Sequence, residues 1–151
     1  MKLRVGRRIG RLYTISLAAY ASSLLMPAVI NPTPTPYAGL VEMWGWQAAL
    51  LSLVPVAMPT AGPSNIGYLL AAAAVAAGWC RAAVGFCVVS LASMIYCGIV
   101  LPPRPGDPIR FPGGHLGPGH YVWLAAGAIM FTAARRASIS SRDALPDRSN
   151  G

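Results

Sequence analysis

The sequence predicts an all-α membrane protein, a bundle of four transmembrane helices with one short re-entrant or interfacial helix. The chain is poor in charge: only 11% of its 151 residues are Asp, Glu, Lys or Arg, and Glu42 is the one charged residue between Arg11 and Arg81. Hydrophobic residues make up 55% of the chain, whereas ordinary soluble domains are about a quarter charged. Clusters of basic residues bound the long apolar stretches, a pattern typical of proteins that cross a membrane several times.

Prolines and basic residues set the limits of the four spans. A hydrocarbon core of about 30 Å needs roughly 20 residues of helix. Prolines at positions 32, 34 and 36 end the first apolar stretch, Arg81 separates the second from the third, and Pro102 and Arg135 end the third and fourth. We therefore expect spans at about 12–30, 64–80, 82–101 and 120–134. They form one transmembrane domain over residues 1–136, followed by a flexible cytoplasmic tail over residues 137–151.

The first span has an alternative, a cleaved signal peptide. Basic residues precede the apolar run 12–30, and Ala19, Ala21 and Ser22 are small residues of the kind a signal peptidase accepts. This run is 19 residues long, whereas the apolar region of a signal peptide has about 7–15 residues. The length favours an uncleaved first span.

Residues 45–58 form the short re-entrant or interfacial helix of this prediction. The segment is apolar but only 14 residues long, with Pro55 near its end, and a stretch of that length rarely crosses a bilayer. If it does not cross, the basic clusters at both termini and Arg81 lie on one side of the membrane. If it crosses, the two terminal clusters lie on opposite sides, against the positive-inside rule. We expect four spans, both termini in the cytoplasm, and an outer loop over 102–119 that packs on the loop over 31–46.

Small residues recur on the predicted spans, most densely over residues 71–78. Such faces let transmembrane helices approach closely, so we expect the second span to be central in the bundle. The same faces are where other membrane subunits would bind. The expected partners are thus the lipid bilayer and other membrane subunits. Nucleic acid is not expected, because the basic residues are gathered in clusters at the ends of the chain rather than spread along one face.

Candidate binding residues gather at the predicted outer side. His115 and His120 are the two histidines of the chain, five positions apart, and could in principle ligate a metal, a haem or a chlorin. A closed metal site needs three or four ligands, so we favour interfacial histidines and expect neither a metal nor a cofactor. Trp46, Gln47 and Asn65 complete a predicted outer-face cluster. Serines at membrane depth have no nearby histidine to activate them, and we expect no enzymatic activity.

Two stretches resemble a group of small bacterial inner-membrane proteins. Residues 116–125 (LGPGHYVWLA) are similar to the LGPGYYLWLAS signature of that group, with His120 in place of a tyrosine. Residues 45–51 (GWQAALL), followed by Asn65, resemble its GWQALLLG…LAN region, although Ser64 and Ile66 flank the asparagine here. The resemblance covers roughly residues 44–70 and 116–134. It implies a four-span architecture and a location in the bacterial inner (cytoplasmic) membrane, and it implies no chemistry.

Two classes of function remain open. The first is a non-catalytic integral membrane protein, an accessory or structural subunit of a bacterial membrane complex. The alternative is a small-ligand binding or transport protein that uses the outer-face cluster of Trp46, Gln47, Asn65, His115 and His120. The sequence offers no catalytic or phosphate-binding motif that would favour an enzyme.

Overall fold

A computed structural model of the chain describes residues 2–30, 42–52, 62–100 and 115–142. Most of these residues belong to five helices, which confirms the predicted helical character of the chain. The helices are α1 (Lys2–Leu24), α2 (Gly45–Ser52), α3 (Gly62–Ala76), α4 (Cys80–Val100) and α5 (Pro118–Arg142). Three short strands accompany them: β1 (Pro27–Ile30), β2 (Glu42–Trp44) and β3 (His115–Leu116).

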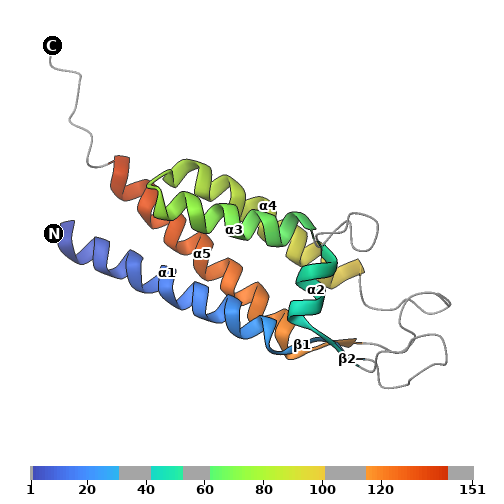
Figure 1. Ribbon diagram of the computed structural model, residues 1–151. Helices are drawn as coiled ribbons and strands as arrows, with labels where there is room; N and C mark the ends of the chain where they lie inside the picture. Colours follow the sequence, from blue (N-terminus) through green and yellow to red (C-terminus); the bar gives the residue numbers. More distant parts are fainter. Residues whose placement is uncertain (1, 31–41, 53–61, 101–114, 143–151) are drawn as a thin grey trace, which may run out of the picture.

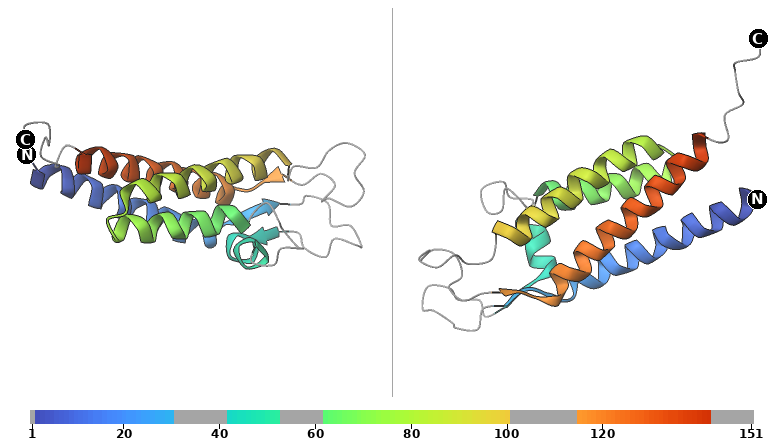
Figure 2. Two further views of the ribbon diagram at one scale, coloured as in Figure 1. Left: turned by 90° about the horizontal axis from the view of Figure 1, so that it is seen from above. Right: turned by 180° about the vertical axis from the view of Figure 1, so that it is seen from behind.

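The four long helices α1, α3, α4 and α5 lie side by side (Figure 1), and the first turns of α1 lie at the same end of this bundle as the last turns of α5. The short helix α2 and the three strands lie at the opposite end, which the two further views also show (Figure 2). This end is called the sheet end below, and the other the terminal end. The sequence predicts a short helix over residues 45–58 that does not cross the membrane. In the structure α2 is a short helix at one end of the bundle and does not run along it. Residues 53–58 of that predicted segment lie outside the described residues.

The first predicted span is wrong at its C-terminal end, because α1 stops at Leu24 and β1 follows. Pro27 explains the change: it has no N–H to donate to a helix, and its ring disfavours helical geometry in the residue before it. β1 pairs antiparallel with β2 on one edge, where Val29 lies opposite Met43, and with β3 on the other, where Val29 lies opposite Leu116. The strand order is β2-β1-β3. Strands of two to four residues are too short to show the alternation of apolar and polar residues by which a strand is predicted from sequence.

The second predicted span ends too late, because α3 stops at Ala76. Gly78 has a φ of 77°, a left-handed conformation that glycine adopts without steric cost. The Trp79 N–H donates to the carbonyl of Ala74 (2.8 Å) and the Gly78 N–H to that of Val75 (3.1 Å). These two bonds are those of a Schellman cap. The cap lets α4 begin directly at Cys80, so α3 and α4 form a tight helical hairpin.

The predicted flexible tail is wrong over residues 137–142, which continue α5 as helix to Arg142. No proline or glycine interrupts residues 135–142, and the Ser141 hydroxyl donates to the carbonyl of Ser138 (2.8 Å) inside the last turns. Residues 143–151 lie outside the described residues. So does most of the predicted contact between loops 31–46 and 102–119, although β2 and β3 bring the inner ends of both loops to the same strand, β1.

Helix α5, and not the second predicted span, is the central helix of the bundle. It contacts α1 along one side and α4 along another, with a smaller contact to α3. Its interior faces consist largely of small residues, and Ala126, Ala133 and Ala134 are fully buried. At Gly127 an added Cβ would lie 2.9 Å from the side chains of Leu91 and Met94 of α4. Small residues on two faces of α5 thus allow close neighbours on both sides. The sequence analysis predicted this central position for the second span, which corresponds to α3.

By length and composition, one helix of the described residues is suited to cross a membrane. Its segment Cys80–Ile99 has 20 residues and a mean hydropathy of 2.0, and only 28% of its most apolar window is buried inside the molecule. Residues Pro63–Ala76 form an apolar helix that is shorter than a span. Helices α1 and α5 are longer but carry arginines in their terminal-end turns. This criterion does not support the predicted bundle of four spans.

Candidate functional site

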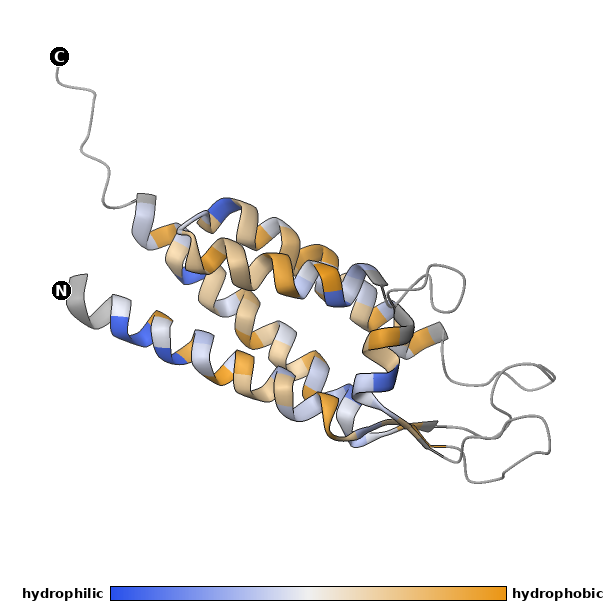
Figure 3. Cartoon of the chain, in the orientation of Figure 1, coloured by the Kyte–Doolittle hydropathy of each residue, from blue (hydrophilic) through white to orange (hydrophobic). Residues whose placement is uncertain are grey.

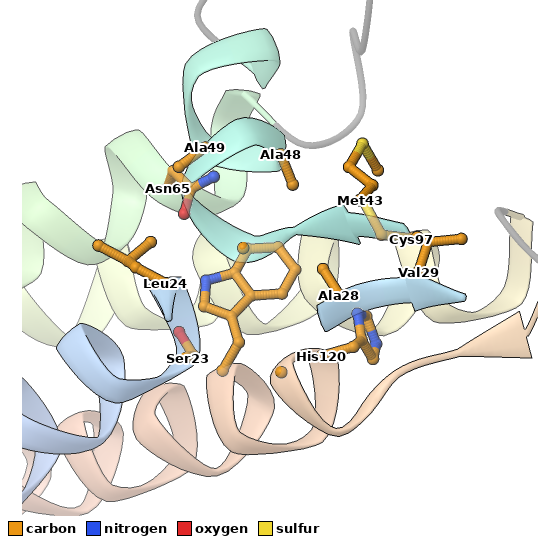
Figure 4. A pocket seen from close by; sticks show the side chains of 13 residues that line it. Ser23, Leu24, Ala28, Val29, Met43, Ala48, Ala49, Asn65, Cys97 and His120 are labelled. Carbon is orange, nitrogen blue, oxygen red and sulfur yellow. The ribbon is translucent and has the colours of Figure 1, made fainter. Parts of the chain in front are cut away.

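A cavity of about 50 Å³ lies at the sheet end, among all five helices and strands β1 and β2 (Figure 4). Its wall is mainly apolar, with Leu24, Val29 and Met43 among the larger side chains. The polar side chains in the wall come from four helices: Ser23 from α1, Asn65 from α3, Cys97 from α4, and His120 and Trp123 from α5. Ligand pockets in proteins are likewise lined mainly by apolar side chains with a few polar groups, but they are larger.

The structure brings together two of the five predicted site residues, Asn65 and His120, in the wall of this cavity. Trp46 does not line it and is 47% exposed. Gln47 accepts a hydrogen bond at its Oε1 from the backbone N–H of Trp44 (2.9 Å), three residues earlier. That bond is half of a capping box at the start of α2, so Gln47 has a structural role there. The backbone of His115 lies in β3, paired with Ile30.

His120 is held at the start of α5 by ring contacts and by a close approach to α4. Its side chain is 6% exposed, and its ring lies edge-on to that of Trp123, with 5.6 Å between centroids and 67° between planes. An added Cβ at Gly98 of α4 would lie 3.1 Å from Nε2 of His120. A glycine at this position of α4 therefore makes the space in which the imidazole lies.

Two sets of hydrogen bonds, joined by a stack of two tyrosine rings, run from Asn65 in the cavity wall into the middle of the bundle. The Tyr20 hydroxyl donates to Oδ1 of Asn65 (3.1 Å). The Tyr20 ring stacks on Tyr68, with 4.3 Å between centroids and 9° between planes. The hydroxyls of Tyr68 and Ser16 lie 2.7 Å apart, and the Ser16 hydroxyl donates to the carbonyl of Ala126 (2.8 Å). Because Ser16 has a single hydroxyl proton, Tyr68 is the donor to Ser16. These contacts join α1, α3 and α5.

Glycines fix the start of α5 against the end of α1. The Gly117 N–H donates to the carbonyl of Ala28, and the Gly45 N–H donates to that of Met26, both at 2.9 Å. At Gly119 an added Cβ would lie 2.9 Å from the carbonyl oxygens of Met26 and Pro27. Consecutive carbonyls after α1 are thus contacted closely by α2 and α5. This contact sets the position of His120 and Trp123 in the cavity wall.

Trp123 lines the cavity, although the sequence did not predict it as a site residue. Its indole nitrogen is buried and makes no hydrogen bond with the residues that the structure describes. The available signal was spacing, since Trp123 follows His120 by three positions and so lies on the same face of a helix. Cys97 and Met43 were also missed, because a cysteine and a methionine in apolar runs are most simply core residues.

The cavity shows no arrangement for holding a metal. Within residues 2–30, 42–52, 62–100 and 115–142, no three His, Cys, Asp or Glu side chains are grouped so that they could bind a metal ion. Cys80 and Cys87 are free thiols. The groups that the wall offers are neutral hydrogen-bond donors and acceptors.

Comparison of the chain with protein-family models, with curated proteins and with solved structures finds no match in any of the three.

Proposed function

We propose that this protein is a non-catalytic integral membrane protein with four spans, formed by α1, α3, α4 and α5. We further propose that it is an accessory or structural subunit of a complex in the bacterial inner membrane. The observation that carries the proposal is that many large apolar side chains lie on the outside of the bundle, whereas a soluble protein buries them. Large apolar side chains are exposed along α3 and α4, namely Ile66, Leu69, Leu70, Val88, Val89, Ile95, Tyr96 and Ile99.

The interior of the same bundle is rich in small and polar residues, with Met94, Met130 and Tyr68 as its largest fully buried side chains. Ser16 and Ser64 are fully buried and Ser90 is 1% exposed. At Gly67 an added Cβ would lie 3.2 Å from the Phe86 carbonyl and from the side chain of Ser90. A soluble protein places its large apolar side chains inside. In lipid, helices gain instead from close backbone approach and from hydrogen bonds between them, and this interior suits that environment.

The distribution of charge supports an orientation with both termini in the cytoplasm. Hydrophilic positions of the described residues lie at the two ends of the bundle, and the stretch between them is mainly apolar (Figure 3). Arginines at the terminal end include Arg11 of α1, Arg81 at the start of α4 and Arg135 of α5. Basic residues are retained on the cytoplasmic side of membrane proteins. With 15 residues, α3 is about 22 Å long, and a locally thinner bilayer accommodates such a helix.

The buried hydroxyls support a structural rather than a catalytic role. Ser16 donates to the Ala126 carbonyl, and Ser90 of α4 donates to the Ser64 carbonyl of α3 (2.7 Å). A nucleophilic serine needs a base that accepts its proton. Here each proton is held by a backbone carbonyl of a neighbouring helix, which ties the two helices together.

The outward face of α4 supports association with another membrane subunit. Exposed residues recur on it at alternating intervals of three and four positions, namely Ala82, Gly85, Val89, Ala92, Tyr96 and Ile99. This spacing forms one stripe along a helix. An added Cβ at Gly85 would meet no atom within 4 Å, so the notch at Gly85 is not used inside the molecule. Small residues at such positions let a second helix approach closely.

Replacing Gly85 with leucine tests this role. Protein extracted in mild detergent is expected to migrate on native sizing with a larger complex, and Gly85→Leu is expected to shift most of it to a small free particle. Ala73→Leu, at an exposed position of α3, adds bulk outside the stripe and should leave the large particle intact. A wild-type protein that migrates alone, or equal behaviour of the two variants, contradicts the proposed association.

A second candidate function is the binding or transport of a small ligand at the sheet end. It is favoured by one observation, that Asn65 and His120 line the same cavity although they are 55 positions apart in the chain.

A further inference from the structure

The cavity at the sheet end contains a hydrogen-bond donor that the protein itself does not satisfy. Trp123 lines the cavity, and its indole N–H is buried without an acceptor among the described residues. A buried N–H without a partner costs roughly 1–3 kcal/mol, and most such groups in folded proteins are satisfied by protein or by a bound molecule. The position of this donor in a cavity wall points to an acceptor inside the cavity.

The volume limits what that acceptor can be. A cavity of about 50 Å³ exceeds the roughly 10–15 Å³ that one water requires, and a water molecule takes about 30 Å³ in the liquid. Complete drug-sized ligands occupy pockets of about 300 Å³ or more. The space therefore admits a water molecule or two, or one terminal group of a longer molecule.

The wall also limits the charge of the occupant. None of the residues that line the cavity is Asp, Glu, Lys or Arg, and most are apolar. An ion placed there would lose its hydration without gaining an opposite charge, which is far more costly than burying a neutral group. The other polar side chains of the wall, namely those of Ser23, Asn65, Cys97 and His120, include no carboxylate, ammonium or guanidinium group.

We propose that the cavity binds an uncharged oxygen that accepts a hydrogen bond from the indole N–H of Trp123. The source of this oxygen is either water or the terminal carbonyl of a neutral amphiphile. The inference deepens the second candidate function, and it uses neither the membrane orientation nor the α4 stripe. A failure here leaves native sizing of the Gly85→Leu variant as a separate test of the first proposal.

Nuclear magnetic resonance of the full chain in detergent micelles, with ¹⁵N in the tryptophan indoles, tests the proposal. The chain has four tryptophans, and loss of one indole signal in Trp123→Phe assigns the signal of Trp123. The protein is then titrated with 2-nonanone, a neutral ketone, and separately with nonane, which has a similar chain but no acceptor. The exposed indole of Trp46 serves as internal control for effects of either probe on the micelle.

A saturable shift of the Trp123 N–H signal with 2-nonanone, absent with nonane, supports an amphiphile carbonyl as the source. A cross-peak between this N–H and water in the ligand-free protein, without a saturable ketone shift, supports water. In either case Ala48→Val, which narrows the cavity from α2 without altering Trp123, should abolish the shift or the cross-peak. Absence of both signals in a folded protein overturns the proposal, as does an equal response to ketone and nonane.

Discussion

Replacing Gly119 with alanine is expected to lower the free energy of unfolding by about 3 kcal/mol, the upper part of the range for an overpacked interior. The added Cβ would lie 2.9 Å from the carbonyl oxygens of Met26 and Pro27 and 3.1 Å from that of Ser23. All three are backbone atoms at the end of α1 and the start of β1, and they cannot move aside as a flexible side chain would. Unfolding in detergent, followed by circular dichroism, measures the loss.

Two other glycines provide matched controls. Gly127→Ala would place its Cβ 2.9 Å from atoms of Leu91 and Met94, but these are the ends of flexible side chains, so a smaller loss of about 1 kcal/mol is expected. Gly85→Ala meets nothing within 4 Å, and in a helix interior alanine is favoured over glycine by up to about 1 kcal/mol. The most stable of the three variants should be Gly85→Ala and the least stable Gly119→Ala, with Gly127→Ala between them. Equal stability of the first and the last would contradict the close approach of α5 to α1.

Replacing Ser16 with alanine is expected to cost about 2 kcal/mol, because it leaves the buried hydroxyl of Tyr68 without its acceptor. Ser16 and Tyr68 are 0% and 1% exposed, and their hydroxyls lie 2.7 Å apart. Tyr68→Phe removes the donor instead and leaves the bond from Ser16 to the Ala126 carbonyl in place. Its expected cost is therefore smaller, about 1 kcal/mol.

The double variant Ser16→Ala/Tyr68→Phe separates this account from simple loss of packing. Removing both partners leaves no unsatisfied hydroxyl, so the double variant should be no less stable than Ser16→Ala alone. The same unfolding measurement gives all three values. Additive costs would show that the two hydroxyls act independently and would contradict the hydrogen bond from Tyr68 to Ser16.

The parts of the fold that the sequence predicted are those set by local breakers of helices. A turn between the second and third spans was predicted at Arg81, and the structure has it a few residues earlier, at 77–79, where Gly78 ends α3. The end of α1 was missed because residues 25–30 continue the apolar run that begins at Leu12, and hydropathy alone does not distinguish a strand from the last turns of a helix. Pro27 was the available signal. The continuation of α5 beyond Arg136 was missed because charge was taken as the end of the helix.

The candidate site was predicted in part, for a reason that concerns tertiary structure. Asn65 and His120 were singled out as polar residues in apolar surroundings, and they do meet in one wall. Trp46 and Gln47 were singled out with them but do not line the cavity. Trp46 lies on the exposed side of α2, and Gln47 caps the start of that helix. No pattern in the sequence indicates which polar side chains of separate helices face each other. The order of the helices around α5 decides this.

Cysteine accessibility in intact cells tests the central claim, a four-span bundle with both termini in the cytoplasm, most directly. The native cysteines are replaced, and single cysteines are introduced at Trp46 near the sheet end, at Trp79 in the α3–α4 turn and at Val89 midway along α4; all three positions are exposed. With an impermeant maleimide, position 46 should react in intact cells, position 79 only after permeabilisation, and position 89 only after the bilayer is dissolved. Reaction at 46 and 79 from the same side, or at 89 without detergent, would contradict the claim.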